Sequence, residues 1–253
     1  MTNSYPESAW KVVAASVAGP HHVREGLPCQ DAFSWRVIGE RLVAAISDGA
    51  GSATHSEQGS RMLSQCVVDA FAEELEAGLQ ESDVRRIAEQ AIETCRAELL
   101  QTYPDANLAD FHATLAAVFM DASGGFVLQI GDGMAAAVQE RQWAPCLLCL
   151  PENGEYAEET FFFTQDHWRE HLRITPVSSE YDELILVTDG AYSFTAKPAA
   201  NGLDRDFIAP VCAFLEQNDE ERGVAALKQI LDHANARRIS GDDKTLLWAK
   251  RKR

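Results

Sequence analysis

Two long amphipathic segments, residues 56–78 and 82–103, constrain the fold of this chain most strongly. In both, apolar residues recur every three or four positions with acidic and basic residues between them, which is the pattern of a helix with one buried face. Short segments rich in Val, Ile, Ala and aromatic residues precede and follow this pair. We therefore expect two long helices between groups of strands.

The strand-like segments lie in three parts of the chain. The first fifty residues predict adjacent antiparallel strands, at 11–19, 31–38 and 41–48, separated by Gly and Pro turns. A second meander is predicted at 113–120, 126–130, 134–139 and 159–163. The last part predicts a strand at 183–189, helices at 204–217 and 220–236, and a closing strand at 244–250. No repeat or Pro/Ser-rich linker divides the chain, so we expect a single domain over residues 1–253.

Composition narrows the classes of partner and compartment. The chain has 253 residues, 46% of them hydrophobic, which suffices for a sizeable core. Its formal net charge of −17 disfavours nucleic acid and anionic membranes as partners. The six cysteines, with no signal sequence and no long apolar run, predict reduced thiols and a cytoplasmic protein. The lone C-x-x-C at 146–149 lacks a second ligand pair for zinc.

Acids recur at the predicted strand ends. Apolar strands run into Asp48-Gly49 and into Asp189-Gly190, and Asp242-Asp243 precedes the last strand. A fourth acid, Asp132, lies between two glycines. Any single Asp-Gly is explained as a good turn, but strand ends in one sheet lie close together and would concentrate negative charge. Carboxylates, a backbone carbonyl and water are the ligands of Mg²⁺ and Mn²⁺.

The ordered motifs resemble a known family. They are Gln30-Asp31-Ala32, Ser47-Asp48-Gly49-Ala50-Gly51-Ser52, Thr114, Gly131-Asp132-Gly133, Val187-Thr188-Asp189-Gly190 and Gly241-Asp242-Asp243-Lys244-Thr245. Together they resemble the motifs of metal-dependent PP2C-type (PPM) protein serine/threonine phosphatases. The opening with Gly19, His22, Gly26 and Pro28-Cys29-Gln30-Asp31-Ala32 is similar to a bacterial subgroup. The resemblance extends from about residue 12 to residue 249.

The resemblance implies an α+β fold, a four-layer α-β-β-α sandwich of two antiparallel sheets flanked by helices. It also implies a centre with two Mg²⁺ or Mn²⁺ ions. By motif, Asp48 would bridge both ions, the Gly49 carbonyl would bind one of them, and Asp189 and Asp242 would complete the other. Asp31 would act through metal-bound water. A metal-bridging hydroxide would then attack phosphoserine or phosphothreonine in line.

Two positions depart from the family pattern at the metals and the proton donor. Gln30 stands where many members carry Glu, which implies weaker binding of the second metal. Ala50 stands where eukaryotic relatives carry a histidine proposed as general acid. A different proton donor, or water, is therefore implied.

The phosphate-binding position also differs. Counting from Gly19, the arginine of many relatives falls on His22, which would contact the substrate phosphate or donate the proton. Arg24 is a second candidate for the phosphate. Asp243 stands where many relatives have Asn and would support the neighbouring metal acid without binding the ion itself.

The leading hypothesis is a metal-dependent phosphatase acting on phosphoserine and phosphothreonine proteins, with a serine/threonine kinase of the same cell as its counterpart. The alternative is a non-catalytic module that binds a phosphoprotein or kinase partner. Ala50, Gln30 and the missing arginine motivate the alternative, whereas retention of all three metal acids argues against it. A hydrolase with an aspartyl-phosphate intermediate is disfavoured, because Asp48-Gly-Ala lacks the second acid of that motif. The physiological substrate and the oligomeric state stay open.

Overall fold

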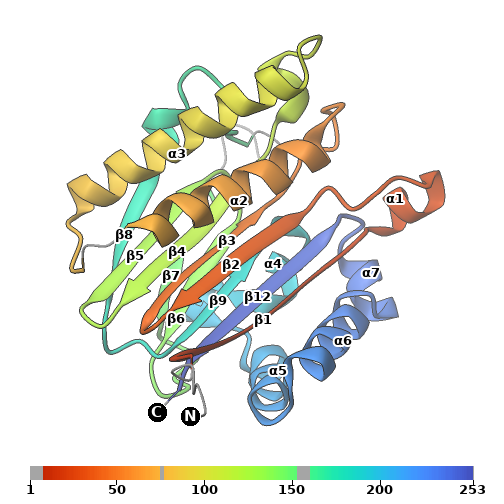
Figure 1. Ribbon diagram of the computed structural model, residues 1–253. Coiled ribbons are helices and arrows are strands. Elements are labelled where there is room, and N and C mark those ends of the chain that lie inside the picture. The colour runs from red at the N-terminus through yellow and green to blue at the C-terminus, as the bar shows by residue number, and fades with distance from the viewer. Residues whose placement is uncertain (1–7, 75–76, 153–159, 253) are drawn as a thin grey trace, which may run out of the picture.

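The computed structural model describes residues 8–74, 77–152 and 160–252 and arranges them in four layers (Figure 1). Two five-stranded sheets lie face to face, and helices cover the outer side of each. Neighbouring strands pair antiparallel throughout both sheets. The predicted α-β-β-α sandwich is confirmed.

The strands divide between the sheets as follows. The first sheet has, in spatial order, β2 (Ala32–Ile38), β3 (Arg41–Ser47), β4 (Leu115–Asp121), β5 (Gly124–Ile130) and β8 (Arg173–Ser178). The second sheet has β1 (Trp10–Val17), β12 (Lys244–Arg251), β9 (Glu183–Val187), β6 (Met134–Val138) and β7 (Leu147–Cys149). A separate short pair consists of β10 (Ala196–Lys197) and β11 (Gly202–Leu203).

The helices are distributed over the two outer faces. They are α1 (Pro20–Glu25), α2 (Ser56–Glu73), α3 (Glu81–Thr102), α4 (Asp189–Thr195), α5 (Arg205–Gln217), α6 (Glu220–Leu231) and α7 (Ala234–Ile239), with short 3₁₀ turns at Leu108–Phe111, Trp168–His171 and Pro198–Ala200. Helices α2 and α3 cover the first sheet, and α5 and α6 cover the second (Figure 1). No helix among the described residues is long and apolar enough to cross a membrane.

Three apolar clusters hold the layers together, because both faces of each sheet are buried. In β3, Val43 and Ala45 pack toward α2 and α3, whereas Leu42, Ala44 and Ile46 pack toward the other sheet. This alternation follows from the period of two along a strand. The third cluster joins the second sheet to α5 and α6. A strand whose residues are nearly all apolar is therefore buried on both faces within this sandwich.

The two long helices form where their periodicity predicts them. In α2, Leu63, Val67 and Phe71 lie four residues apart on one face and are fully buried. In α3, Val84 and Ala91 contribute to the same cluster. The side chains of Gln80 and Asp83 form a capping box at the start of α3, which satisfies backbone donors that the first turn leaves free. Burial of one apolar face therefore accounts for both helices, and the capping box marks where α3 starts.

The strand predictions are wrong in three places. Strand β1 does not pair with β2, because α1 and the loop after it carry the chain from the second sheet, where β1 pairs with β12 along its whole length, to the first sheet. The strand predicted at 159–163 does not form over residues 161–163, whose backbone runs as a loop, while residue 159 lies outside the described part. Conversely, β8 forms where no strand was predicted, at the edge of the first sheet, where Pro176 is tolerated.

Three helical details also differ from the prediction. Helix α6 ends at Leu231, and α7 follows as a separate helix. Helix α4 begins at Asp189, where the sequence suggested only a turn. Helix α1 forms in the connection between the strands predicted at 11–19 and 31–38, where only a turn was expected. It has Pro20 in its first turn and Gly26 at its C-cap with a φ of 68°. These short helices all lie near the strand ends that carry the acids.

Candidate active site

Four acids from separate strand ends line one cleft at one end of the sandwich. Asp48 follows β3, Asp189 follows β9, Asp242 precedes β12, and Asp132 lies in the loop between β5 and β6. The cleft has a volume of about 570 Å³. The sequence-based expectation that these acids converge agrees with this placement.

The backbone around Asp48 is held by the neighbouring strand end. Its N–H donates to the Thr114 hydroxyl at 3.2 Å, and the Thr114 N–H donates to the Asp48 carbonyl at 2.9 Å. The Ser47 hydroxyl donates to the Thr114 carbonyl at 2.6 Å. A Cβ on Gly49 would lie 2.7 Å from the carbonyl oxygens of Gln30 and Ser56, so only glycine fits there. This strand end is therefore rigid.

Asp31 lies buried behind Asp48 and is only 7% exposed. Its Oδ2 accepts hydrogen bonds from the hydroxyls of Thr188 at 2.8 Å and Thr245 at 2.7 Å. Its Oδ1 is buried and has no hydrogen-bond donor among the described residues. The two threonines orient the carboxylate and leave one oxygen for another partner.

The carboxylates raise one another's pKa values because they are close together and largely removed from water. Burial raises the pKa of Asp48 well above its usual range, and the charges of Asp31 and Asp189 raise it further. Burial also raises the pKa of Asp31 to about 8, although its threonine partners favour the charged form. Burial raises the pKa of Asp189 to about 6. Bound cations would remove this penalty.

Lys244 is the cation that the fold itself supplies here. Its side chain is buried, and its Nζ donates to the Asp242 carbonyl at 2.6 Å. Burial lowers the pKa of Lys244, while the charges of Asp242 and Asp243 oppose that shift. One buried lysine does not balance the charges of the acids that act on it, which are Asp31, Asp189, Asp242 and Asp243. The sequence showed Lys244 only as part of a motif, and its role was not predicted.

The neighbouring acid, Asp243, forms a dyad with His22. The Asp243 carboxylate accepts from the backbone N–H groups of Gly19 and Gln30, both at 2.6 Å, and its Oδ1 lies 2.8 Å from Nδ1 of His22. His22 is 8% exposed and lines the cleft. When Nδ1 donates to Asp243, Nε2 is the ring atom left for the cleft.

The donor set fits divalent cations. Asp189, Asp132 and Asp31 each keep one buried Oδ1 without a hydrogen-bond donor, and Gln30 keeps its Oε1. Buried polar oxygens are normally paired, so four in one place point to a missing electropositive partner. Among residues 8–74, 77–152 and 160–252, no group of three or more His, Cys, Asp or Glu side chains is positioned to hold a metal ion through side chains alone. Backbone carbonyls, such as that of Gly49, and water would have to supply the remaining ligands, as they commonly do for Mg²⁺.

The structure does not bring every predicted residue to the cleft. Arg24 lies in the last turn of α1, is exposed, and is not among the cleft-lining residues. Gln30 and Asp243 lie directly beside the acids, as their motif positions predict. Thr160 and Phe162 line the cleft but were not identified from the sequence. They come from the irregular segment before β8, where no periodicity marks a site.

The sequence of this chain matches the family described as protein phosphatase 2C over residues 18–232. The chain belongs to the protein phosphatase 2C family. The predicted family and enzyme class, a hydrolase that removes phosphate from protein serine and threonine residues, are therefore confirmed. No comparison supports the alternative of a non-catalytic module.

One curated relative and many solved structures are similar to this phosphatase along its whole length. Serine/threonine-protein phosphatase 3 of Escherichia coli is 27% identical over 96% of this chain and 100% of that protein. The structure of phosphatase Stp1 from Staphylococcus aureus has a TM-score of 0.65 at 13% identity, covering 97% of this chain and 96% of that one. The catalytic domain of PstP, in complex with 2 manganese ions, has a TM-score of 0.59 at 16% identity, covering 95% and 97%. These structural similarities establish the fold.

Proposed function

We propose that the acidic cleft hydrolyses phosphoserine and phosphothreonine in proteins with two divalent cations, Mg²⁺ or Mn²⁺. The observation that carries this proposal is a single cleft lined by Asp48, Asp132, Asp189 and Asp242, in which the buried Oδ1 atoms of Asp132 and Asp189 have no hydrogen-bond donor. Asp48, the Gly49 carbonyl, Asp189 and Asp242 would hold the ions. The similar fold of PstP with 2 manganese ions supports the choice of metal. The ions, when bound, neutralise phosphoryl oxygens and lower the pKa of water.

Asp48 and Asp31 have distinct parts in this proposal. Thr114 holds the backbone of Asp48 at the end of β3, and the side chain of Asp48 lines the cleft. Asp31 is held by two threonine hydroxyls through one oxygen. Its other oxygen accepts a hydrogen bond from cleft water and orients that water toward phosphorus.

His22 supplies the proton that the leaving oxygen of serine or threonine requires. Asp243 holds the ring at 2.8 Å through Nδ1, and the backbone donors of Gly19 and Gln30 hold Asp243 in turn. In the protonated ring, Nε2 donates to the leaving oxygen, and the neighbouring Asp243 carboxylate stabilises the imidazolium. A positive His22 also attracts the substrate phosphate. Both roles left open for this residue are therefore compatible with one position.

We extend the proposal to the cellular context. Phosphoserine proteins are produced by serine/threonine kinases, so the substrates would come from such a kinase in the same cytoplasm. The membership of the chain in a protein phosphatase family supports this extension. The net charge of −17 supports the exclusion of nucleic acid as a partner.

Hydrolysis of p-nitrophenyl phosphate and of a phosphoserine peptide tests the proposal. We expect turnover with Mn²⁺, loss of turnover with EDTA, and recovery when Mn²⁺ is restored. Asp48→Asn should abolish turnover of both substrates. Activity that survives both EDTA and Asp48→Asn would rule out the two-metal site. Metal binding in calorimetry without any turnover would instead support a non-catalytic module.

A further inference from the structure

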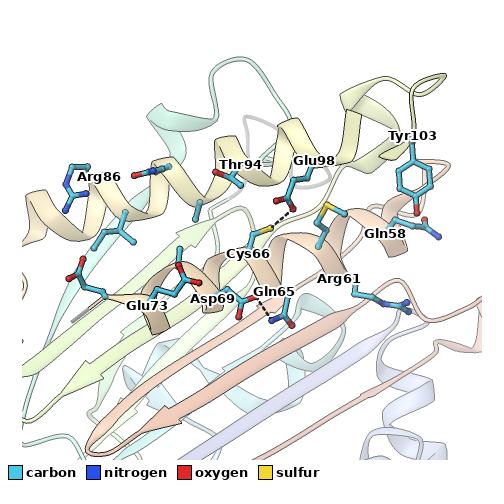
Figure 2. Close-up of a pocket in the computed structure, with 16 residues that line it drawn as sticks. Gln58, Arg61, Gln65, Cys66, Asp69, Glu73, Arg86, Thr94, Glu98 and Tyr103 are labelled. Atoms are coloured by element: carbon cyan, nitrogen blue, oxygen red, sulfur yellow. Dashed lines mark hydrogen bonds between the residues drawn. The ribbon is translucent and has the colours of Figure 1, made fainter. Parts of the chain in front are cut away.

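A groove runs between α2 and α3 on the outer face of the first sheet, and the proposed function does not use it. Figure 2 shows side chains from both helices pointing into this space. Its volume is about 900 Å³, which exceeds the volume of the catalytic cleft. We call it the α2–α3 groove. Met62 from α2 and Ile87 and Ala91 from α3 give it an apolar floor.

The walls of the α2–α3 groove are predominantly acidic. Asp69 and Glu73 on α2 and Glu98 on α3 line it (Figure 2). Arg61 and Arg86 also line it, and Arg61 forms an i,i+4 ion pair with Glu57. Asp69 forms an ion pair with Arg36 at 2.5 Å, so Glu73 and Glu98 are the acids on which the charge of the groove chiefly depends. Lysine and arginine side chains fit such a surface, because their alkyl stems cover apolar atoms while their charged ends reach carboxylates.

The groove is continuous with the surroundings of the catalytic cleft. Tyr103 lines the end of the groove beside the start of α2 and also lines a smaller depression of about 300 Å³ with His55 and Asp110. The rings of His55 and Tyr103 stack at 5.5 Å between centroids. The loop that leads to His55 starts at residues 49–52, which line the cleft. An extended chain can therefore pass from the cleft over this loop into the groove.

We propose that the α2–α3 groove docks a segment of the phosphoprotein substrate that carries lysine or arginine residues on one side of the phosphorylated site. This proposal rests on the proposed function. The start of α2 is adjacent to the metal loop, because a Cβ on Gly49 would lie 2.7 Å from the Ser56 carbonyl. Asp69 lies thirteen residues further along the helix, which is about 20 Å at 1.5 Å per residue. An extended substrate covers that length with about six residues.

A pair of phosphoserine peptides tests the docking. Both share the same central residues, and one carries two Lys-Arg pairs about six residues from the phosphoserine, while the other carries glutamines there. At low salt we expect the basic peptide to have a KM lower by roughly 5- to 10-fold, with an unchanged kcat. The preference should decline at high salt. Equal KM values for the two peptides would overturn the proposal.

A variant that removes two acidic charges from the α2–α3 groove tests whether the preference for the basic peptide arises there. The double variant Glu73→Gln/Glu98→Gln should remove most of the preference for the basic peptide and leave p-nitrophenyl phosphate hydrolysis unchanged. The matched control, Glu220→Gln/Glu221→Gln, makes the same charge change at the exposed start of α6 and should keep the preference. A preference that survives in the groove variant would overturn the proposal. Hydrolysis of p-nitrophenyl phosphate separates either failure from a failure of the proposed function.

Cys66 offers a measurement that does not depend on turnover. Its thiol lies in the groove, 3.8 Å from Oε2 of Glu98. A hydrogen bond with Cys95 lowers the pKa of the Cys66 thiol, which favours its reaction with an alkylating reagent. The basic peptide should slow alkylation of Cys66 several-fold, and the glutamine peptide should not. Cys66→Ser identifies the modified thiol. Equal alkylation rates with both peptides, or protection that depends only on enzyme concentration and so indicates a second copy in the groove, would overturn the proposal.

Discussion

Buried acids lie at both ends of the paired strands β9 and β12, and the two ends differ in whether the fold neutralises them. Far from the cleft, Glu183 is 0% exposed and accepts hydrogen bonds from Nε1 of Trp248 at 2.6 Å and Nζ of Lys250 at 3.3 Å. At the cleft end, Asp189 and Asp31 each keep a buried oxygen without a donor. At the end far from the cleft, β12 therefore supplies the donors that neutralise the buried carboxylate of Glu183. At the cleft end, the unpaired oxygens of Asp189 and Asp31 need a bound ligand to neutralise them.

Removing one acid from each end tests whether the two ends serve different purposes. Asp189→Asn should reduce phosphatase activity on the order of 10³-fold, because the loss of metal-centred charge stabilisation costs several kcal/mol. It should leave the Tm of the metal-free protein unchanged or raised, since it removes a charge that the fold does not pair. Kinetics with Mn²⁺ and thermal melting in EDTA measure the two effects.

Glu183→Gln should give the opposite result. It weakens the contact of Lys250 with Glu183, whereas the ion pair of Lys250 with Asp182 at 3.0 Å remains, so we expect the Tm to fall by roughly 2–4 °C. The specific activity of the folded fraction should stay near that of the parent protein. A large loss of activity without a change in Tm would contradict the division between the two ends.

The second prediction concerns the proton donor. His22→Gln should lower kcat for a phosphoserine peptide by roughly 10²-fold, the usual size of a general-acid contribution. Hydrolysis of p-nitrophenyl phosphate should change much less, because nitrophenolate leaves without a proton. His233→Asn, in an exposed cap of α7, is the matched control. Equal losses for both substrates would show that His22 binds phosphate and does not donate a proton.

The third prediction uses the pH dependence of stability. The carboxyls of Asp189 and Asp31 have pKa values raised from 3.8 to about 6 and about 8 by burial. Below about pH 4 they are protonated in both the folded and unfolded states, so they impose no penalty. As the pH rises toward 8, the unfolded chain releases protons that the folded chain retains, and the metal-free protein loses stability.

Thermal melting in EDTA from pH 5 to pH 8 checks this sign. We expect the Tm to fall by several °C over that range, and Mn²⁺ to raise the Tm more at pH 8 than at pH 5. Asp48→Asn should flatten the fall, whereas Glu183→Gln should lower the whole curve without changing its slope. A Tm that rises steadily with pH in EDTA would refute the idea that the cleft acids are uncompensated.

The sequence predicted the parts of the fold that local pattern determines. Helices α2 and α3 and strand β9 were identified because their apolar periods are long or uninterrupted. The pairing of β1 with β12 was not identified, because the two strands lie more than two hundred residues apart in the sequence and no local signal encodes their contact. Edge strand β8 was missed because its alternation is weak and contains Pro176.

The site shows the same division. Asp48, Asp189 and Asp242 were found because each stands in a short motif at a strand end. The contact of His22 with Asp243 depends on α1 lying beside the loop before β12, which spacing alone does not reveal. Phe162 and Thr160 carry no motif and enter the cleft only through the path of the chain before β8.

The smallest expected effect comes from Gln30, the neutral residue where many relatives have Glu. Its Oε1 is buried without a donor, next to the cleft acids. Gln30→Glu adds one negative charge there and should tighten Mn²⁺ binding by roughly 3- to 10-fold, since one charge at an effective dielectric near 20 contributes about 1 kcal/mol at a separation of several ångströms after desolvation. The same charge should destabilise the metal-free protein, so affinity and Tm in EDTA should move in opposite directions. Gln139→Glu makes the same change at an exposed position after β6, at the end of that strand opposite Asp132, and should leave Mn²⁺ affinity unaltered. Calorimetric titration measures the affinity, and an unchanged value for Gln30→Glu would mean that its oxygen does not face the ions.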